Sequence, residues 1–196
     1  HRVDRRQRQM CIRDSPKSTE SLVLFYNKSK LSADDVKTWE GMTAKAGFAA
    51  NYTDPYYSYP VFFTAGTTLF GKSGEDVKST DVASANGVKA LEWIAAQKSN
   101  KNVIQTTNAL NQLQAGKVAA MFDGPWDTAN IKKILGDNFA VAPYPTINID
   151  GQAKQLQSFQ GIKGFAVNSA SKSQAAAQTV APVSYTHLRA HETRED

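Results

Sequence analysis

A short apolar run that stops abruptly at a turn constrains the fold of this chain more than any other feature. Residues 118–122 read V-A-A-M-F, a pattern typical of a strand buried in a parallel sheet. The tripeptide D-G-P follows at once, and these residue types end a strand and turn the chain. Trp126 comes next, and residues 127–131 read as the start of a helix. The pattern therefore places a large amphipathic ring at the carboxyl end of a strand, the rim where open α/β sheets bind ligands.

Two interpretations of this ring are open from the stretch alone. Trp126 either lies at a ligand site or fills the gap between the sheet and the next helix. Trp39 is different, because Val36, Trp39 and Met42 share the spacing of one helix face, and we expect Trp39 to belong to the core.

The two ends of the chain do not read as natural protein sequence. Q-M-C-I-R-D-S at 9–15 and P-V-S-Y-T-H-L at 182–188 can be encoded by complementary strands of one DNA element. Both resemble the translated transposon-end adapter of sequencing libraries. We therefore expect residues 1–15 and 182–196 to be adapter artefacts and residues 16–181 to be a fragment of a natural protein, and we exclude the ends from fold reasoning.

Removing the ends changes what composition implies. The formal net charge is +5 for the whole sequence and falls to +3 for residues 16–181, because the Arg-rich start is lost. We therefore expect no nucleic-acid partner. Cys11 and all three histidines lie in the excluded ends, so residues 16–181 lack a His-activated nucleophile and the usual zinc ligands. We expect no metal and no cofactor, and no apolar run approaches membrane-spanning length.

Strand and helix signals alternate along residues 20–178. The expected strands are 20–27, 48–50, 118–122, 139–142 and 161–167. The expected helices are 32–47, 81–97, a short one capped by Thr106 or Thr107, 127–135, and one that begins at 168. This alternation predicts an α/β layered fold.

A tyrosine-rich segment carries the second chemical signal. Residues 51–60 read N-Y-T-D-P-Y-Y-S-Y-P, and each phenol needs a polar partner if it is buried. The segment is either a helix entry whose tyrosines pack, or a loop that offers rings and a carboxylate to a polar ligand. Sugars present an apolar CH face to a ring and hydroxyls to a carboxylate, so rings beside carboxylates favour binding over turnover.

Two other classes of protein stay open on residues alone. A glycoside-processing enzyme needs two converging carboxylates, for which Asp54 and Asp123 are the main candidates and Glu20 a third. Their spacing does not show that any two of them meet. A purely structural domain, with every aromatic in the core, is the other alternative.

Five segments resemble the maltose/maltodextrin-binding proteins, the extracellular solute-binding components of sugar ABC importers. They read E-S-L-V-L-F-Y-N-K, K-T-W-E, D-P-Y-Y-S-Y-P, L-Q-A-G-K-V-A-A-M-F-D-G-P-W and F-A-V-N-S-A-S. The resemblance covers nearly all of residues 20–178, and the two turns G-P-W and acidic-Pro-Tyr are specific in combination. It implies a periplasmic-binding-protein-like (type II) α/β fold. This chain would hold mostly the second, C-terminal lobe with hinge-crossing strands, returning to the first lobe after about residue 165.

The resemblance also implies a set of sugar-binding residues. Glu20 lies where the first hinge crossing offers a carboxylate, Asp54 takes the place of the family's glutamate, Pro55 follows it, Tyr56 is the adjoining ring, and Trp126 is the stacking tryptophan. Two departures bear on the preferred sugar. Asp54 is one methylene shorter than glutamate, and Thr106 stands where well-known relatives have a cleft tyrosine.

The implied function is extracellular binding of maltose or maltodextrin for ABC-transporter import, by closure of two lobes on the sugar. The protein would not be an enzyme. We expect it to be a monomer whose partners are the sugar and the membrane permease subunits, either lipid-anchored at the extracellular face of the membrane or periplasmic. Another sugar is the alternative ligand. Residues 16–181 alone should be poorly soluble and bind sugar weakly, because they hold only part of the site.

Overall fold

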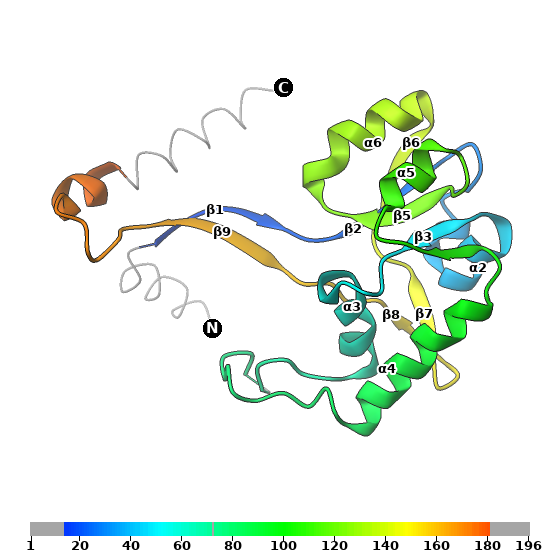
Figure 1. Ribbon diagram of the computed structural model, residues 1–196, viewed down its shortest axis with the longest axis horizontal. Coiled ribbons are helices and arrows are strands. Elements are labelled where there is room, and N and C mark those ends of the chain that lie inside the picture. The colour runs from blue at the N-terminus through cyan, green and yellow to red at the C-terminus, as the bar shows by residue number, and fades with distance from the viewer. Residues whose placement is uncertain (1–13, 72, 181–196) are drawn as a thin grey trace. The chain divides into compact units, whose positions relative to one another are not determined.

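Five short strands form the sheet around which most of the chain is built (Figure 1). They are β2 (Val23–Asn27), β3 (Phe48–Ala50), β4 (Val103–Gln105), β5 (Ala120–Asp123) and β6 (Phe139–Ala142), in the order β4-β3-β5-β2-β6. β3 is parallel to β4 and β5, whereas β2 is antiparallel to β5 and β6. The carboxyl ends of β3, β4, β5 and β6 therefore lie at one edge of the sheet.

The computed structural model describes residues 14–71 and 73–180, which form two units. The larger unit is Ser21–Phe159, and the smaller contains the described residues up to Glu20 and from Gln160 onward. In the smaller unit, β1 (Asp14–Glu20) pairs antiparallel with β9 (Gly161–Ala166). The two predicted adapter segments lie almost wholly outside the described residues.

Helices cover both faces of the sheet in the larger unit. Figure 1 shows α3 (Pro55–Ala65) and α4 (Ala85–Ala96) on one side, and α5 (Ala109–Gln114) and α6 (Thr128–Leu135) on the other. The remaining elements are α2 (Trp39–Lys45), the hairpin β7 (Thr146–Ile149) and β8 (Gln152–Gln155), and the short 3-10 turns η1 (Asp35–Lys37), η2 (Gln97–Ser99), η3 (Pro125–Asp127) and η4 (Gly136–Asn138).

Alternation along the strands divides the core into two clusters. In β5, Ala120 and Phe122 face the cluster under α3 and α4, while Met121 faces the cluster under α5 and α6. All four residues of β5 are buried, because helices cover the sheet on both sides. The run predicted as a strand over 118–122 is buried as expected, but the strand itself spans 120–123.

Trp39 belongs to the core, and this prediction is confirmed. Its side chain is only 2% exposed, and its ring centroid lies 4.8 Å from that of Phe48. Its indole N–H donates to Oε1 of Gln97 at 2.8 Å, so the buried polar group is satisfied.

The prediction of one helix over residues 32–47 is wrong. Ser32 and Asp35 form the expected reciprocal hydrogen bonds, but the chain makes only a 3-10 turn there. Thr38 is extended, with φ −127° and ψ 146°, and its hydroxyl accepts from the backbone N–H of Gly41. It also forms an isolated bridge with Thr146. Thr38 therefore starts a second helix, α2, instead of continuing the first.

Other predicted boundaries shift by a few residues. The helix predicted from 81 begins at Ala85, because the Ser84 hydroxyl caps it. The helix after β4 begins after Asn108 and not directly at a threonine cap. The last predicted helix, from 168, begins at 174. Within the described ranges, no helix is both long enough and apolar enough to span a bilayer.

Candidate functional site

Trp126 lies at the carboxyl end of β5, as the sequence predicts. Gly124 and Pro125 turn the chain, and Trp126 sits inside the 3-10 turn η3. Its indole folds back over the preceding turn, so closely that a Cβ at Gly124 would lie 2.2 Å from ring atoms. The side chain is nonetheless 47% exposed. Trp126 is therefore not a buried filler between sheet and helix.

The Asp54-Pro55-Tyr56 segment forms the start of α3. Asp54 is extended, and its carboxylate accepts from the backbone N–H of Tyr56 at 2.9 Å, so it caps the helix. Pro55 occupies the first turn, where its missing N–H costs nothing. The tyrosine-rich segment is thus a helix entry, and Asp54 and Pro55 remain on the surface.

Three aromatic rings from distant parts of the chain form a continuous row, which we call the ring row: Trp126, Tyr56 and Phe159. The Tyr56 and Trp126 centroids lie 6.2 Å apart with the rings tilted by 41°. Phe159 stacks on Tyr56, with centroids 5.5 Å apart and an interplanar angle of 2°. Such a row offers flat apolar surface to a ligand with apolar CH faces.

A polar cavity of about 290 Å³ opens at the same edge of the sheet. Its lining includes the ends of β3 and β5 and the start of α5. The polar groups that line it are Asn51, Tyr52, Tyr57, Thr107, Asn108, Asp123 and Asp127. The lining has carboxylates and, among the described residues, no lysine or arginine, so it suits a ligand that donates hydrogen bonds.

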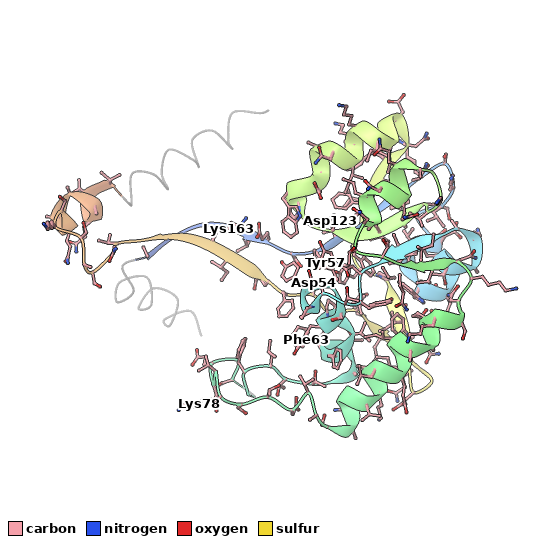
Figure 2. The ribbon with its side chains drawn as sticks, in the orientation of Figure 1. Asp54, Tyr57, Phe63, Lys78, Asp123 and Lys163 are labelled. Atoms are coloured by element: carbon pink, nitrogen blue, oxygen red, sulfur yellow. The ribbon has the colours of Figure 1, made fainter. Side chains whose placement is uncertain are left out.

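Asp123 is the buried carboxylate of this cavity, with 5% of its surface exposed. The Gly124 N–H donates to its Oδ1 at 2.7 Å and the Tyr57 hydroxyl donates to the same oxygen at 3.4 Å. Figure 2 shows Tyr57 and Asp123 next to each other in this region. Burial raises the pKa of Asp123, and the nearby Asp127 carboxyl raises it further. Burial is also the main reason that the pKa of Tyr57 is raised.

Glu20, the remaining predicted site residue, belongs to the smaller unit. Its backbone pairs with Gly161, and its Oε2 forms an ion pair with Nζ of Lys163 at 2.9 Å. A Cβ at Gly161 would lie 3.0 Å from Cγ of Glu20, so the glycine leaves room for this side chain.

The structure brings together some of the predicted site residues. Tyr56 and Trp126 are neighbours in the ring row, and Asp54 and Pro55 precede Tyr56 directly. Sequence reasoning missed Phe159 and Tyr57 as site residues. Tyr57 is in the tyrosine-rich segment that drew attention, but the loop around Phe159 has no periodic pattern that could have indicated its contact with Tyr56. Among the described residues, no three His, Cys, Asp or Glu side chains gather in a metal-binding cluster.

Comparison with known proteins decides the family. The model of the bacterial extracellular solute-binding protein family matches residues 14–183. The chain belongs to this family. Its fold is accordingly the α/β fold of the type II periplasmic binding proteins, as the resemblance predicts.

Similar solute-binding proteins carry oligosaccharide names. A maltooligosaccharide ABC transporter solute-binding lipoprotein of Streptococcus pneumoniae is 30% identical, over 84% of this chain and 43% of that protein. A galactooligosaccharide-binding protein of Bacillus subtilis is 29% identical, over 85% of this chain and 43% of that protein.

One protein of known structure is similar to this chain at higher sequence identity than these relatives. The maltodextrin binding protein MalE1 from L. casei BL23, without ligand, is 59% identical with a TM-score of 0.82. The match covers 87% of this chain and 46% of that one. The chain thus spans less than half the length of the solute-binding proteins that it matches.

Proposed function

We propose that this chain is part of a carbohydrate-binding protein that captures maltose or maltodextrin for import by an ABC transporter. The observation that carries the proposal is the ring pair of the exposed Trp126 and the partly buried Tyr56, at the carboxyl edge of a solute-binding fold. A sugar ring would stack on this pair. Its hydroxyls would donate to carboxylates at the edge of the stack, with Asp54 the nearest in sequence.

Glu20, Asp54, Pro55, Tyr56 and Trp126 are the proposed sugar contacts from this chain. Residues 16–181 would form mostly the C-terminal lobe, and the rest of the site would come from a lobe that the chain lacks. Closure of two lobes on the sugar is the proposed mode of capture. The protein would act outside the membrane, lipid-anchored or periplasmic, as a monomer that delivers sugar to permease subunits.

A hydrolase is the less supported alternative. The named relatives are binding proteins. The Asp54 carboxylate is engaged as a helix cap, and Asp123 is buried and hydrogen-bonded to Tyr57. These hydrogen bonds within the protein favour binding over turnover.

A galactooligosaccharide is the second candidate ligand, because one relative of nearly equal identity carries that name. Thr106 bears on this choice, since a bulky ring at this position would narrow the rim next to the cavity. The shorter carboxylate at Asp54 bears on it too.

Isothermal titration calorimetry tests the proposal. The material is the complete protein, meaning the natural gene product that contains residues 16–181 together with the length that this chain lacks. It is titrated with maltose, maltotriose and a β-galactooligosaccharide, and the mixtures are analysed for hydrolysis products. Saturable binding of a maltodextrin without new reducing ends is the expected result. Hydrolysis would support the enzyme, and binding of the galactoside alone would change the ligand.

A further inference from the structure

Phe159 contacts one face of α3. Its ring stacks on Tyr56, meets Phe63 edge-on with centroids 4.9 Å apart and an angle of 86°, and lies 6.1 Å from the ring of Tyr59. Residues spaced three and four apart lie on the same side of a helix, so these three rings form one surface on which Phe159 rests.

The backbone just before Phe159 is tied to the same helix. The N–H of Gln157 donates to Oγ1 of Thr64 at 3.0 Å, and this hydroxyl in turn donates to the carbonyl of Pro60 at 2.8 Å. The position of the Phe159 ring is therefore set by both a hydrogen bond and ring packing.

Tyr56 lies in the first turn of α3, and three other rings contact it. Phe159 lies parallel to its ring, Tyr57 is perpendicular to it at 6.0 Å, and Trp126 is tilted against it. Phe159 is the only one of these neighbours that comes from the segment after β8. It is also the last residue of the larger unit, so the chain leaves this unit directly after the stacked ring.

We propose that Phe159 is a positioning residue for the sugar-binding surface. By stacking on Tyr56 it holds that ring at a fixed angle to Trp126, so the surface is ordered before the ligand arrives. A surface ordered in advance loses less conformational entropy on binding. The inference rests on the proposed function, because it assigns Phe159 a role in the same site.

Affinity for maltotriose in the complete protein measures this role. Phe159→Leu should raise the Kd about three- to tenfold, the range expected for loss of one aromatic pair. Phe159→Tyr keeps the ring and should restore an affinity within about twofold of the unmodified protein. Phe159→Met, which fills space without a ring, should behave like Phe159→Leu and serves as the second variant if Phe159→Leu fails to fold.

A double-mutant cycle separates positioning from general destabilisation. In a Tyr56→Leu background, Phe159→Leu should change the Kd less than twofold, because the ring that it positions is gone. Phe139→Leu is the matched control. Phe139 also belongs to an aromatic pair, with Phe25 at 5.9 Å, but in the cluster under α5 and α6. It should lower the thermal midpoint and leave the Kd unchanged.

Two outcomes would overturn the inference. If Phe159→Leu leaves the Kd unchanged while Trp126→Ala weakens binding, the site stands and Phe159 has no positioning role. If Phe159→Leu and Phe139→Leu weaken binding equally, the effect is one of stability. Failure of the unmodified protein to bind any of the three sugars would instead overturn the proposed function, and this inference with it.

Discussion

At the scale of single residues, Asp123 shows how burial and charge act on one carboxylate. It lies at the end of a fully buried strand, and burial together with Asp127 raises its pKa, against the opposing effect of the Gly124 N–H and the Tyr57 hydroxyl. A carboxyl whose pKa is raised on folding binds protons more tightly in the folded state. Its ionisation therefore lowers stability as pH rises above the ordinary aspartate value of 3.8.

Asp123→Asn should accordingly stabilise the complete protein at neutral pH. The amide oxygen still accepts from Gly124 and Tyr57, and the charge next to Asp127 is removed. Urea unfolding followed by circular dichroism should give a higher midpoint for the variant at pH 7. The difference should narrow as pH falls towards 3.8. A lower midpoint at pH 7 would mean that the ionised carboxylate stabilises the fold.

Gly124 affects the site because its lack of a side chain leaves room for the Trp126 ring. Its backbone, with φ −98° and ψ 171°, is one that alanine adopts readily, but a Cβ there would meet the Trp126 ring. Gly124→Ala should therefore displace the indole and weaken maltotriose binding about fivefold or more. The free energy of unfolding should change by only about 0.5 kcal/mol, because the indole is half exposed. Calorimetry and urea unfolding measure the two effects, and unchanged affinity would mean that the indole position is not critical.

At the scale of elements, Asp54 at the start of α3 has one observed role and one proposed role. Asp54 caps the helix, and we also propose that its carboxylate accepts from the sugar. Asp54→Asn keeps a good cap and should leave stability unchanged while raising the Kd about tenfold, because a charge-assisted hydrogen bond is lost. Asp54→Ala should raise the Kd similarly and also cost about 1 kcal/mol of stability. Wild-type affinity of Asp54→Asn would restrict Asp54 to capping.

The elements also show how much of the fold the sequence predicts. β3 and β6 have the predicted bounds, because each is a short apolar run between clear stop signals. The sequence predicts one helix over 32–47 because apolar residues keep helical spacing across Thr38. Its break depends on a bridge to Thr146, which lies far along the sequence. Local pattern cannot indicate a contact of this kind.

The site, too, has parts that the local sequence predicts and parts that it does not. The place of Trp126 follows from a local strand-turn pattern, and the prediction that it lies at the rim is confirmed. The contacts of Phe159 with Tyr56 and of Tyr57 with Asp123 join residues that are distant in sequence. They follow from how α3 packs against the sheet, which no single segment encodes. Resemblance to a family supplied Glu20, Asp54 and Pro55 as candidates, and their roles are still predictions.

At the scale of the whole molecule, length is the dominant fact. The chain covers less than half of the relatives that it matches, and in the function that we propose its rings would form one side of a two-lobed site. Affinity in such a site depends on contacts from both lobes, because closure is driven by the ligand's preference for the closed state. Experiments on function therefore belong to the complete protein.

The most direct test of the account is the affinity of Trp126→Ala for maltotriose in the complete protein, measured by calorimetry. Loss of ring burial and stacking, about 2–3 kcal/mol, predicts a Kd on the order of thirty- to hundred-and-fifty-fold higher. The control is Trp93→Phe, because Trp93 is a partly buried tryptophan that packs against Trp39 and lies outside the ring row; this change should leave the Kd unchanged. A change of less than threefold in Trp126→Ala would remove Trp126 from the site and contradict the account.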